Sequence, residues 1–294
     1  MARRKCTKIV RGQNAVDGAG VRLRRVLGIK TIKEFDPFLM LDGFDSDDPK
    51  DYLQGFPWHP HRGIETVTYL LEGEIEHGDS LGNSGVIGRL QCQWMTAGSG
   101  IIHQEMPRES DRLLGCQLWV NLPEKDKMTR PAYRDIKQED VALVKENNAE
   151  IRVISGNYKG SAGAVKGEYV KVQYLDVRLD PGTVWSYSET PNNQTLFLYL
   201  ISGNLAADEN LEKYEEKACA MLMTASSENE ADHDEVRVKS GNEGARLLLV
   251  AGEPLKEPVS WGGPIVMNTR EELDLAFREL DNNTFIKHEK PQEL

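Results

Sequence analysis

Two pairs of apolar segments recur along the chain at almost the same spacing, and this repetition constrains the fold more than any other feature. Residues 66–75 (TVTYLLEGEI) align with residues 195–205 (TLFLYLISGNL) at an offset of 130. Residues 114–123 (LGCQLWVNLP) align with residues 245–254 (ARLLLVAGEP) at an offset of 131. Because self-similarity at a fixed spacing indicates a repeated structural unit, the sequence predicts a duplicated domain.

The repeated segments are of β type. They are short, rich in Val, Ile, Leu and aromatic residues, and separated by Gly, Asn and Pro, as in sandwiches and barrels. A chain of 294 residues has room for two such cores. We therefore expect an all-β protein with two antiparallel, jelly-roll-like barrel domains at 1–133 and 134–294, divided near the polar stretch 131–150. A short helix should follow the capping box Thr269–Glu272, before the C-terminal tail.

Composition excludes several classes of protein. A net charge of −11 disfavours a broad nucleic-acid-binding surface, so we expect no direct contact with nucleic acid. No apolar run approaches the ~20 residues of a membrane span, and the start MARRKCTKIVRG lacks the apolar core of a secretory signal. The four cysteines are widely separated, which argues against a disulfide framework. We expect an intracellular protein, cytoplasmic or nuclear, without membrane association.

Two histidine-containing pairs stand one residue apart in strand-like segments. His59 and His61 lie in GFPWHPHRGIETVTYLLEG, and His103 and Glu105 lie in WMTAGSGIIHQEMP. Residues i and i+2 of a strand share a face. If both pairs converge inside a barrel, they supply three imidazoles and one carboxylate, a set that can hold a divalent first-row metal.

The second half does not repeat this pattern. At the offset of the repeat, His59 and His61 correspond to Glu189 and Pro191, and His103 falls near Asp234. We therefore expect one metal ion per chain, bound by the first domain.

These residues resemble a known family. Gly55, His59, His61, Glu65 and Gly73 resemble the first cupin motif, and GSGIIH resembles the second. More specifically, the chain resembles the pirins, a bicupin family, through the segments DPFLMLDGF, HPHRGIETVTYLLEG, QWMTAGSGIIHQEMP, QLWVNLP, AGEPLKEPV and GPIVMNT. The resemblance extends in order over most of the chain.

The resemblance implies iron(II) in the N-terminal cupin, held by His59, His61, His103 and Glu105, and a C-terminal cupin without metal. Manganese, nickel, copper and zinc remain open as alternatives to iron. In many cupins the carboxylate ligand corresponds to Glu65. The pirin pattern favours Glu105, with Glu65 in a structural or ligand-orienting role, and the spacing of the residues does not decide between them.

Further residues are candidates for the surroundings of the metal. Gln117 could orient a metal-bound side chain through a hydrogen bond. Phe56, Trp58, Trp94 and Met106 could line a substrate pocket, and Trp58 stands where the family commonly has Asp. His77 lies outside both motifs, and we expect it at the surface.

Two functions are compatible with such a site. The resemblance implies a quercetin 2,3-dioxygenase, in which the metal binds the 3-hydroxyl of a flavonol, Glu105 acts as the catalytic proton acceptor, and dioxygen opens the ring. The alternative is a non-enzymatic, iron-binding nuclear cofactor whose redox state alters its binding to a transcription-regulator protein. A purely structural metal is disfavoured, because structural sites tend to be four-coordinate and rich in sulfur.

Overall fold

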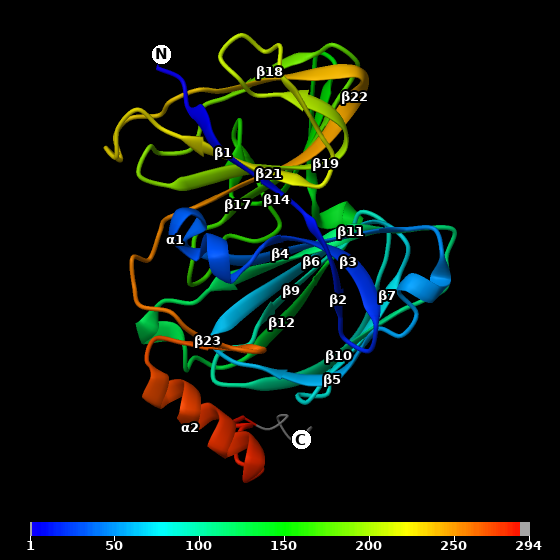
Figure 1. Cartoon of the computed structure of the whole chain (residues 1–294), viewed down its shortest axis with the longest axis vertical. Helices are drawn as coiled ribbons and strands as arrows, with labels where there is room; N and C mark the ends of the chain where they lie inside the picture. Colours follow the sequence, from blue (N-terminus) through cyan, green and yellow to red (C-terminus); the bar gives the residue numbers. More distant parts are fainter. Residues whose placement is uncertain (1, 289–294) are drawn as a thin grey trace. The chain divides into compact units, whose positions relative to one another are not determined.

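The computed structural model describes residues 2–288 and divides into two compact units (Figure 1). The N-terminal unit comprises residues 14–25, 38–138 and the segment from Leu255 onward. The C-terminal unit comprises residues 139–254, 26–37 and the segment up to Gln13.

The predicted ranges 1–133 and 134–294 differ from these units at both ends of the chain, although the main division lies close by. The reason is strand pairing and packing that local sequence does not reveal. Strand β1 (Lys5–Arg11) pairs antiparallel with β21 (Cys219–Thr224), so the start of the chain belongs to the C-terminal unit. The last described segment packs within the N-terminal unit.

Two sheets form the N-terminal unit. The larger runs in the order β12-β9-β6-β11-β4-β3-β2, and the smaller in the order β5-β10-β7-β8. The strands of the larger sheet are β2 (Gln13–Asp17), β3 (Val21–Leu27), β4 (Phe38–Ser46), β6 (Ile64–Glu72), β9 (Cys92–Thr96), β11 (Leu113–Asn121) and β12 (Ala132–Ile136). Those of the smaller sheet are β5 (Phe56–His61), β7 (Ile75–Asp79), β8 (Ser84–Ile87) and β10 (Ile101–Pro107).

Apolar side chains from both sheets pack together to close one part of this barrel. Phe44 and Leu70 of the larger sheet belong to the same buried cluster as Ile75 and Ile87 of the smaller sheet. Burial of such side chains contributes about 1.5–3 kcal/mol each to folding. One region of the barrel interior is therefore apolar, and elsewhere the interior contains buried polar side chains such as His61, His103 and Glu105.

The C-terminal unit repeats the barrel with a different interior. Its sheet runs in the order β1-β21-β19-β22-β17-β14-β13, with β18 paired to β22 and β20 paired to β19. Its core consists of aliphatic and aromatic side chains. The remaining strands are β13 (Ala142–Glu146), β14 (Ala149–Ser155), β17 (Gln173–Leu179), β18 (Val184–Tyr187), β19 (Thr195–Ala206), β20 (Tyr214–Glu216) and β22 (Val236–Gly252), with a hairpin of β15 (Asn157–Tyr158) and β16 (Ser161–Ala162).

The repeated segments of the sequence occupy equivalent places in the two units. The first repeat forms β6, which pairs with β11, and the second repeat forms β19, which pairs with β22. The predicted all-β architecture of two antiparallel barrels is confirmed.

Helical structure is short, as expected. Helix α2 (Arg270–Asp281) begins at the predicted capping box: the Thr269 hydroxyl accepts from the backbone N–H of Glu272, whose carboxylate accepts from the backbone N–H of Thr269. The other helical segments are α1 (Ile32–Phe35) and the 3-10 turns η1 (Ile29–Thr31), η2 (Pro49–Asp51), η3 (Glu124–Asp126) and η4 (Gln138–Asp140). None of the helices formed by residues 2–288 is long and apolar enough to cross a lipid bilayer.

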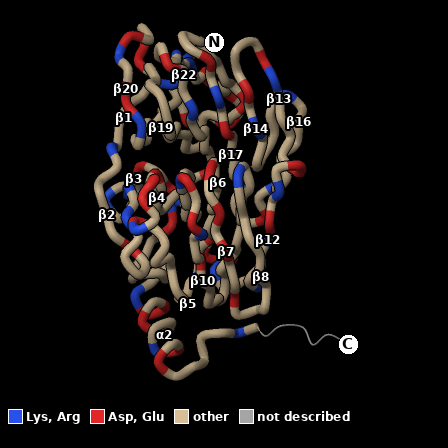
Figure 2. Tube along the Cα trace, turned by 90° about the vertical axis from the view of Figure 1, so that its right-hand side faces the viewer, with Lys and Arg blue, Asp and Glu red and all other residues tan. Residues whose placement is uncertain are grey.

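Charged residues of both signs are interspersed along the chain. Figure 2 shows basic and acidic positions interspersed over each unit. Some of them form ion pairs, such as Arg246 of β22 with Asp176 of the neighbouring strand β17, and Arg112, just before β11, with Asp45 of β4.

Two buried cations join the chain after His61 to the C-terminal segment. Arg62 donates to the backbone carbonyls of Ser99 and Phe285. The ammonium group of Lys127 donates to the carbonyls of Gly63 and Val266. Val266 lies in β24 (Ile265–Met267), which pairs with β23 (Ser260–Gly262). The hairpin is thus fixed beside the turn that follows His61.

Gly63 is required for this close approach. Its φ of +77° is unfavourable for other residues, and a Cβ atom at this position would lie 1.9 Å from the carbonyl oxygen of Val266. We expect Gly63→Ala to lower the free energy of unfolding by about 2–5 kcal/mol, combining backbone strain with steric overlap. Urea unfolding of the two proteins measures this difference.

Gly263→Ala is the matched control, because Gly263 also has a positive φ of +53° but no atom lies within 4 Å of its added Cβ. Gly263→Ala should cost only about 1–2 kcal/mol, the contribution of the backbone strain. Equal losses in the two variants would show that the hairpin does not press on Gly63.

Candidate metal centre

Strands β5 and β10 bring the two histidine-containing pairs together. The strands are antiparallel neighbours, with His103 opposite His59 and Ile101 opposite His61. Directly opposed residues of an antiparallel pair lie on the same face of the sheet. The alternation along each strand then directs all three imidazoles into the barrel.

The three imidazoles form one compact cluster. The ring centroids of His59 and His103 are 4.3 Å apart, and those of His61 and His103 are 5.0 Å apart. One nitrogen from each ring lies within 4.8 Å of the others. His61 and His103 are buried, and His59 is partly exposed. Within residues 2–288, this is the group of histidine, cysteine and acidic side chains whose geometry suits a metal ion.

Two backbone carbonyls fix the tautomers of His59 and His61. The Nδ1–H of His59 donates to the carbonyl of Pro57 at 2.8 Å, and the Nδ1–H of His61 donates to the carbonyl of Pro264 at 2.9 Å. A carbonyl can only accept, so Nδ1 carries the proton in each neutral ring. Both Nε2 atoms therefore carry lone pairs.

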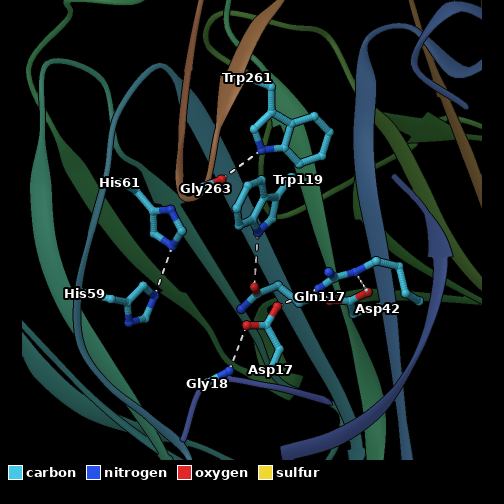
Figure 3. A network of polar contacts seen from close by, with 10 residues as sticks. Asp17, Gly18, Asp42, His59, His61, Gln117, Trp119, Trp261 and Gly263 are labelled. Carbon is cyan, nitrogen blue, oxygen red and sulfur yellow. Dashed lines mark hydrogen bonds and ion pairs between the residues drawn. The ribbon is translucent and has the colours of Figure 1, made fainter. Parts of the chain in front are cut away.

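These two lone pairs face each other. The Nε2 atoms of His59 and His61 are 3.1 Å apart (Figure 3), a separation at which two neutral acceptors repel. A cation placed between them converts this repulsion into attraction, and imidazole is a ligand for several first-row divalent metals. The donor set therefore fits a metal ion.

Burial favours the neutral form of the His61 and His103 imidazoles. Burial, reinforced by the neighbouring His59 ring, lowers the pKa of His61 to about 3. Burial also holds the pKa of His103 well below its usual range. Neutral rings at physiological pH are the form that binds metal ions.

Glu105 lies on the face of β10 that carries His103, but its carboxylate is engaged by neutral donors. The hydroxyl of Thr68 donates to Glu105 Oε1 at 3.0 Å. The amide of Gln117 donates to both carboxylate oxygens, at 3.0 and 2.8 Å. Gln117 therefore orients Glu105, and the cluster of ligand atoms within 4.8 Å contains the histidines without Glu105.

Glu65 lies on a different face. It is in β6, three residues before Thr68, so its side chain leaves the strand on the side opposite to Thr68. Its Oε1 accepts a hydrogen bond from the hydroxyl of Thr96 at 2.7 Å. This placement is consistent with a structural role for Glu65.

The four predicted pocket residues are placed differently from one another. The Phe56 ring lies 6.5 Å from that of His59, centroid to centroid. Trp58 is 55% exposed, next to His59 in β5 and on the opposite face. Met106 directly follows Glu105 in β10, where buried residues alternate with partly exposed ones, so its side chain points away from those of His103 and Glu105. Trp94 is buried in β9 next to Gln93, whose strand partner is Thr68, so Trp94 too lies on the other face.

Three features of the site escaped sequence reasoning. Trp119 packs edge-on against His61 at 5.0 Å (Figure 3) and in turn contacts Trp261 at 5.8 Å, measured between ring centroids. The carbonyl of Pro264 comes from a hairpin about 200 residues away in the chain. His77, expected at the surface, is buried, and its ring lies 5.4 Å from that of His103. Only His77 carried a usable signal, because HGD at 77–79 repeats the spacing of the ligand pairs.

Both units match known protein families. Residues 20–120 match the family model described as Pirin, and residues 174–286 match the model described as Pirin C-terminal cupin domain. A pirin-like protein of Caulobacter vibrioides is 44% identical over 285 residues, which cover 96% of this chain and 99% of the relative. Pirin of Homo sapiens is 39% identical over 284 residues, which cover 95% of this chain and 93% of the relative.

A solved structure agrees with these matches. The crystal structure of quercetin 2,3-dioxygenase from Acinetobacter baumannii has a TM-score of 0.84 and 29% identity to this chain. The alignment covers 97% of this chain and 99% of the other.

The low pKa of His61 predicts how the stability of the metal-free protein depends on pH. Between pH 6.5 and about 3 the unfolded chain binds a proton that folded His61 excludes, so stability falls as the pH falls. The slope should reach about 1.4 kcal/mol per pH unit for this histidine. Urea unfolding of metal-free protein between pH 7 and 5 measures it.

His61→Gln is the comparison variant, since it removes the titrating ring. Its unfolding free energy should depend less steeply on pH than that of the wild type. An identical pH slope in both proteins would contradict the assignment of a neutral, buried His61.

Proposed function

The chain belongs to the pirin family, and we propose that it is a metal-dependent dioxygenase that cleaves flavonols such as quercetin with dioxygen. One observation carries this proposal: the Nε2 lone pairs of His59 and His61 face each other. His103 adds a third imidazole to this cluster. The likeness to a quercetin 2,3-dioxygenase over nearly the whole chain supports the same reaction class.

His59, His61 and His103 would hold the ion, and Glu105 would complete an N₃O ligand set from the same face of β10. We propose iron(II) as the native metal. Manganese, nickel, copper and zinc also bind imidazole and carboxylate ligands, so metal analysis decides among them.

The bound metal would supply Lewis acidity, lowering the pKa of the flavonol 3-hydroxyl that binds to it. Glu105 would accept the proton released from this hydroxyl. Gln117 and Thr68 hold the Glu105 carboxylate in place, and Gln117 is itself held by the indole N–H of Trp119 at 3.2 Å. The overall reaction would consume one dioxygen and convert the flavonol into a depside and carbon monoxide.

The aromatic surroundings of the cluster suit a planar substrate. Trp119 is edge-on to His61, and Trp261 extends the aromatic surface beyond it. Aromatic rings favour offset-stacked and edge-to-face contacts with other aromatic rings. This supports a flavonol over a small aliphatic substrate.

The purified protein should contain about one metal ion per chain and should consume quercetin under air. Chelation should abolish turnover, and adding iron(II) should restore it. His103→Ala should remove most of the metal, because it deletes one of the three imidazoles. Elemental analysis and the loss of flavonol absorbance measure these outcomes.

Two results would contradict this assignment. One is a tightly held second ion that survives His59→Ala combined with His61→Ala. The other is a metal-loaded protein that binds quercetin but never turns it over, which would favour the alternative of a non-enzymatic, redox-sensitive cofactor of a transcription regulator.

Glu105 and Glu65 can be separated by one substitution each. Glu105→Gln keeps the size of the side chain but removes its charge, so metal affinity should fall and quercetin turnover should fall further, by about 10²–10⁴-fold. Glu65→Gln should lower mainly the free energy of unfolding, since Glu65 bonds to Thr96 on the other face of β6. Metal content and turnover of both variants decide the matter. Wild-type metal and turnover in Glu105→Gln, with loss of both in Glu65→Gln, would reverse the assignment.

A further inference from the structure

The inner face of the small sheet of the N-terminal unit carries a third pair of polar residues beside the two ligand pairs. Strand β10 lies between β5 and β7. In the pairing of β10 with β7, Asp79 is opposite His103 and His77 is opposite Glu105. Opposed residues share a face, so His77 and Asp79 point into the barrel with the ligands.

The His77 ring is held tightly. It stacks on Tyr133 with a centroid distance of 4.5 Å and an angle of 13° between the rings. Its Nε2 lies 3.7 Å from Asp79 Oδ2. Asp79 is fixed in turn by the backbone N–H groups of Leu81 and Asn83 and by the Asn83 amide.

His103 and His77 share a feature that His59 and His61 do not have. Among the described residues, no hydrogen bond reaches either ring nitrogen of His103 or of His77, although both side chains are buried, and the Nε2 of His77 has only its longer contact of 3.7 Å with Asp79. Buried polar atoms are rarely left without a partner, because each one costs about 1–3 kcal/mol. A metal ion would engage one nitrogen of His103 and leave the other to be satisfied.

Histidines that bind metals nearly always donate their second ring N–H to an orienting group. Pro57 and Pro264 provide this group for His59 and His61. The His77 ring, 5.4 Å from the His103 ring, is placed to provide it for His103. Because Nε2 of His77 faces Asp79, its Nδ1 is the nitrogen left to accept from His103. A small rotation of the rings or one bridging water closes this contact.

We propose that His77, backed by Asp79 and Tyr133, is the positioning residue that orients His103 for metal binding. The proposal rests on the metal site of the proposed function and does not depend on the substrate. Three strands then contribute to one site: β5 and β10 supply the ligands, and β7 supplies the pair that orients one of them.

Cobalt(II) is a suitable probe, because its visible absorption bands report the arrangement of its ligands. We compare the wild type with His77→Phe, which keeps a ring to stack on Tyr133 but has no nitrogen, and His77→Asn, which restores an acceptor near the position of Nδ1. Glu76→Gln is the control on the same strand, since Glu76 is exposed and faces away from the site. Cobalt affinity is measured by competition with a chelator, and the stability of each metal-free protein by urea unfolding.

His77→Phe should weaken cobalt binding by about 10- to 100-fold and alter the absorption bands. The metal-free variant should be about as stable as the wild type, because the phenyl ring keeps the stacking on Tyr133, and the loss of the 3.7 Å contact with Asp79 is offset by removal of the buried Nδ1, which has no partner. His77→Asn should recover part of the affinity, and Glu76→Gln should bind like the wild type.

The proposal fails if His77→Phe binds cobalt with wild-type affinity and absorption bands. It also fails if the loss of affinity is accompanied by an equal loss of stability in the metal-free protein and His77→Asn rescues nothing, since His77 would then be a packing residue. A wild-type protein that binds cobalt as described but does not consume quercetin overturns the proposed dioxygenase activity and leaves the role of His77 standing.

Discussion

The site depends on one unfavourable contact: the Nε2 lone pairs of His59 and His61 are held close together by the surrounding backbone. His59 and His61 would turn their rings apart if they were free to do so, because their Nε2 atoms repel at 3.1 Å. The carbonyls of Pro57 and Pro264 prevent that rotation by engaging Nδ1 of each ring. The fold thus holds an unfavourable arrangement that a cation would make favourable, which is preorganisation of a binding site.

The carbonyl of Pro264 makes the site dependent on a distant part of the chain. The β23–β24 hairpin that carries it is fixed by Lys127, whose ammonium group reaches Gly63 and Val266 together. Burial lowers the pKa of Lys127 to about 8, so this side chain is held at a cost in solvation that its hydrogen bonds must offset. The histidine cluster and the last segment of the N-terminal unit are therefore joined structurally, although some 200 residues separate His61 from Pro264 in sequence.

Sequence reasoning succeeded where local geometry controls the outcome. The i, i+2 spacing predicted that His59 and His61, and likewise His103 and Glu105, each share a strand face, and the capping box predicted the start of α2. The same rule of alternation, applied to Trp58 and Met106, would have directed them away from the predicted ligands, because Trp58 is the immediate neighbour of His59 and Met106 is the immediate neighbour of Glu105. Glu65 could not be placed by that rule, because the turn at Gly63 resets the alternation between β5 and β6. The position of Pro264 and the pairing of β1 with β21 could not be predicted, because they depend on tertiary contacts between distant segments.

The two barrels share one architecture but differ in what fills their interiors. In the C-terminal unit, side chains such as Leu198, Leu247 and Trp185 are buried in a continuous apolar core, which contributes directly to folding. In the N-terminal unit, part of the interior is occupied by His61, His103 and Glu105. Burial of these polar groups opposes folding unless each has a hydrogen-bond partner or binds an ion. A site of this kind persists only when its polar atoms are paired by the surrounding strands or by a ligand. On the inner face of the small sheet, polar pairs on three adjacent strands provide some of these partners. The bound ion would provide the others.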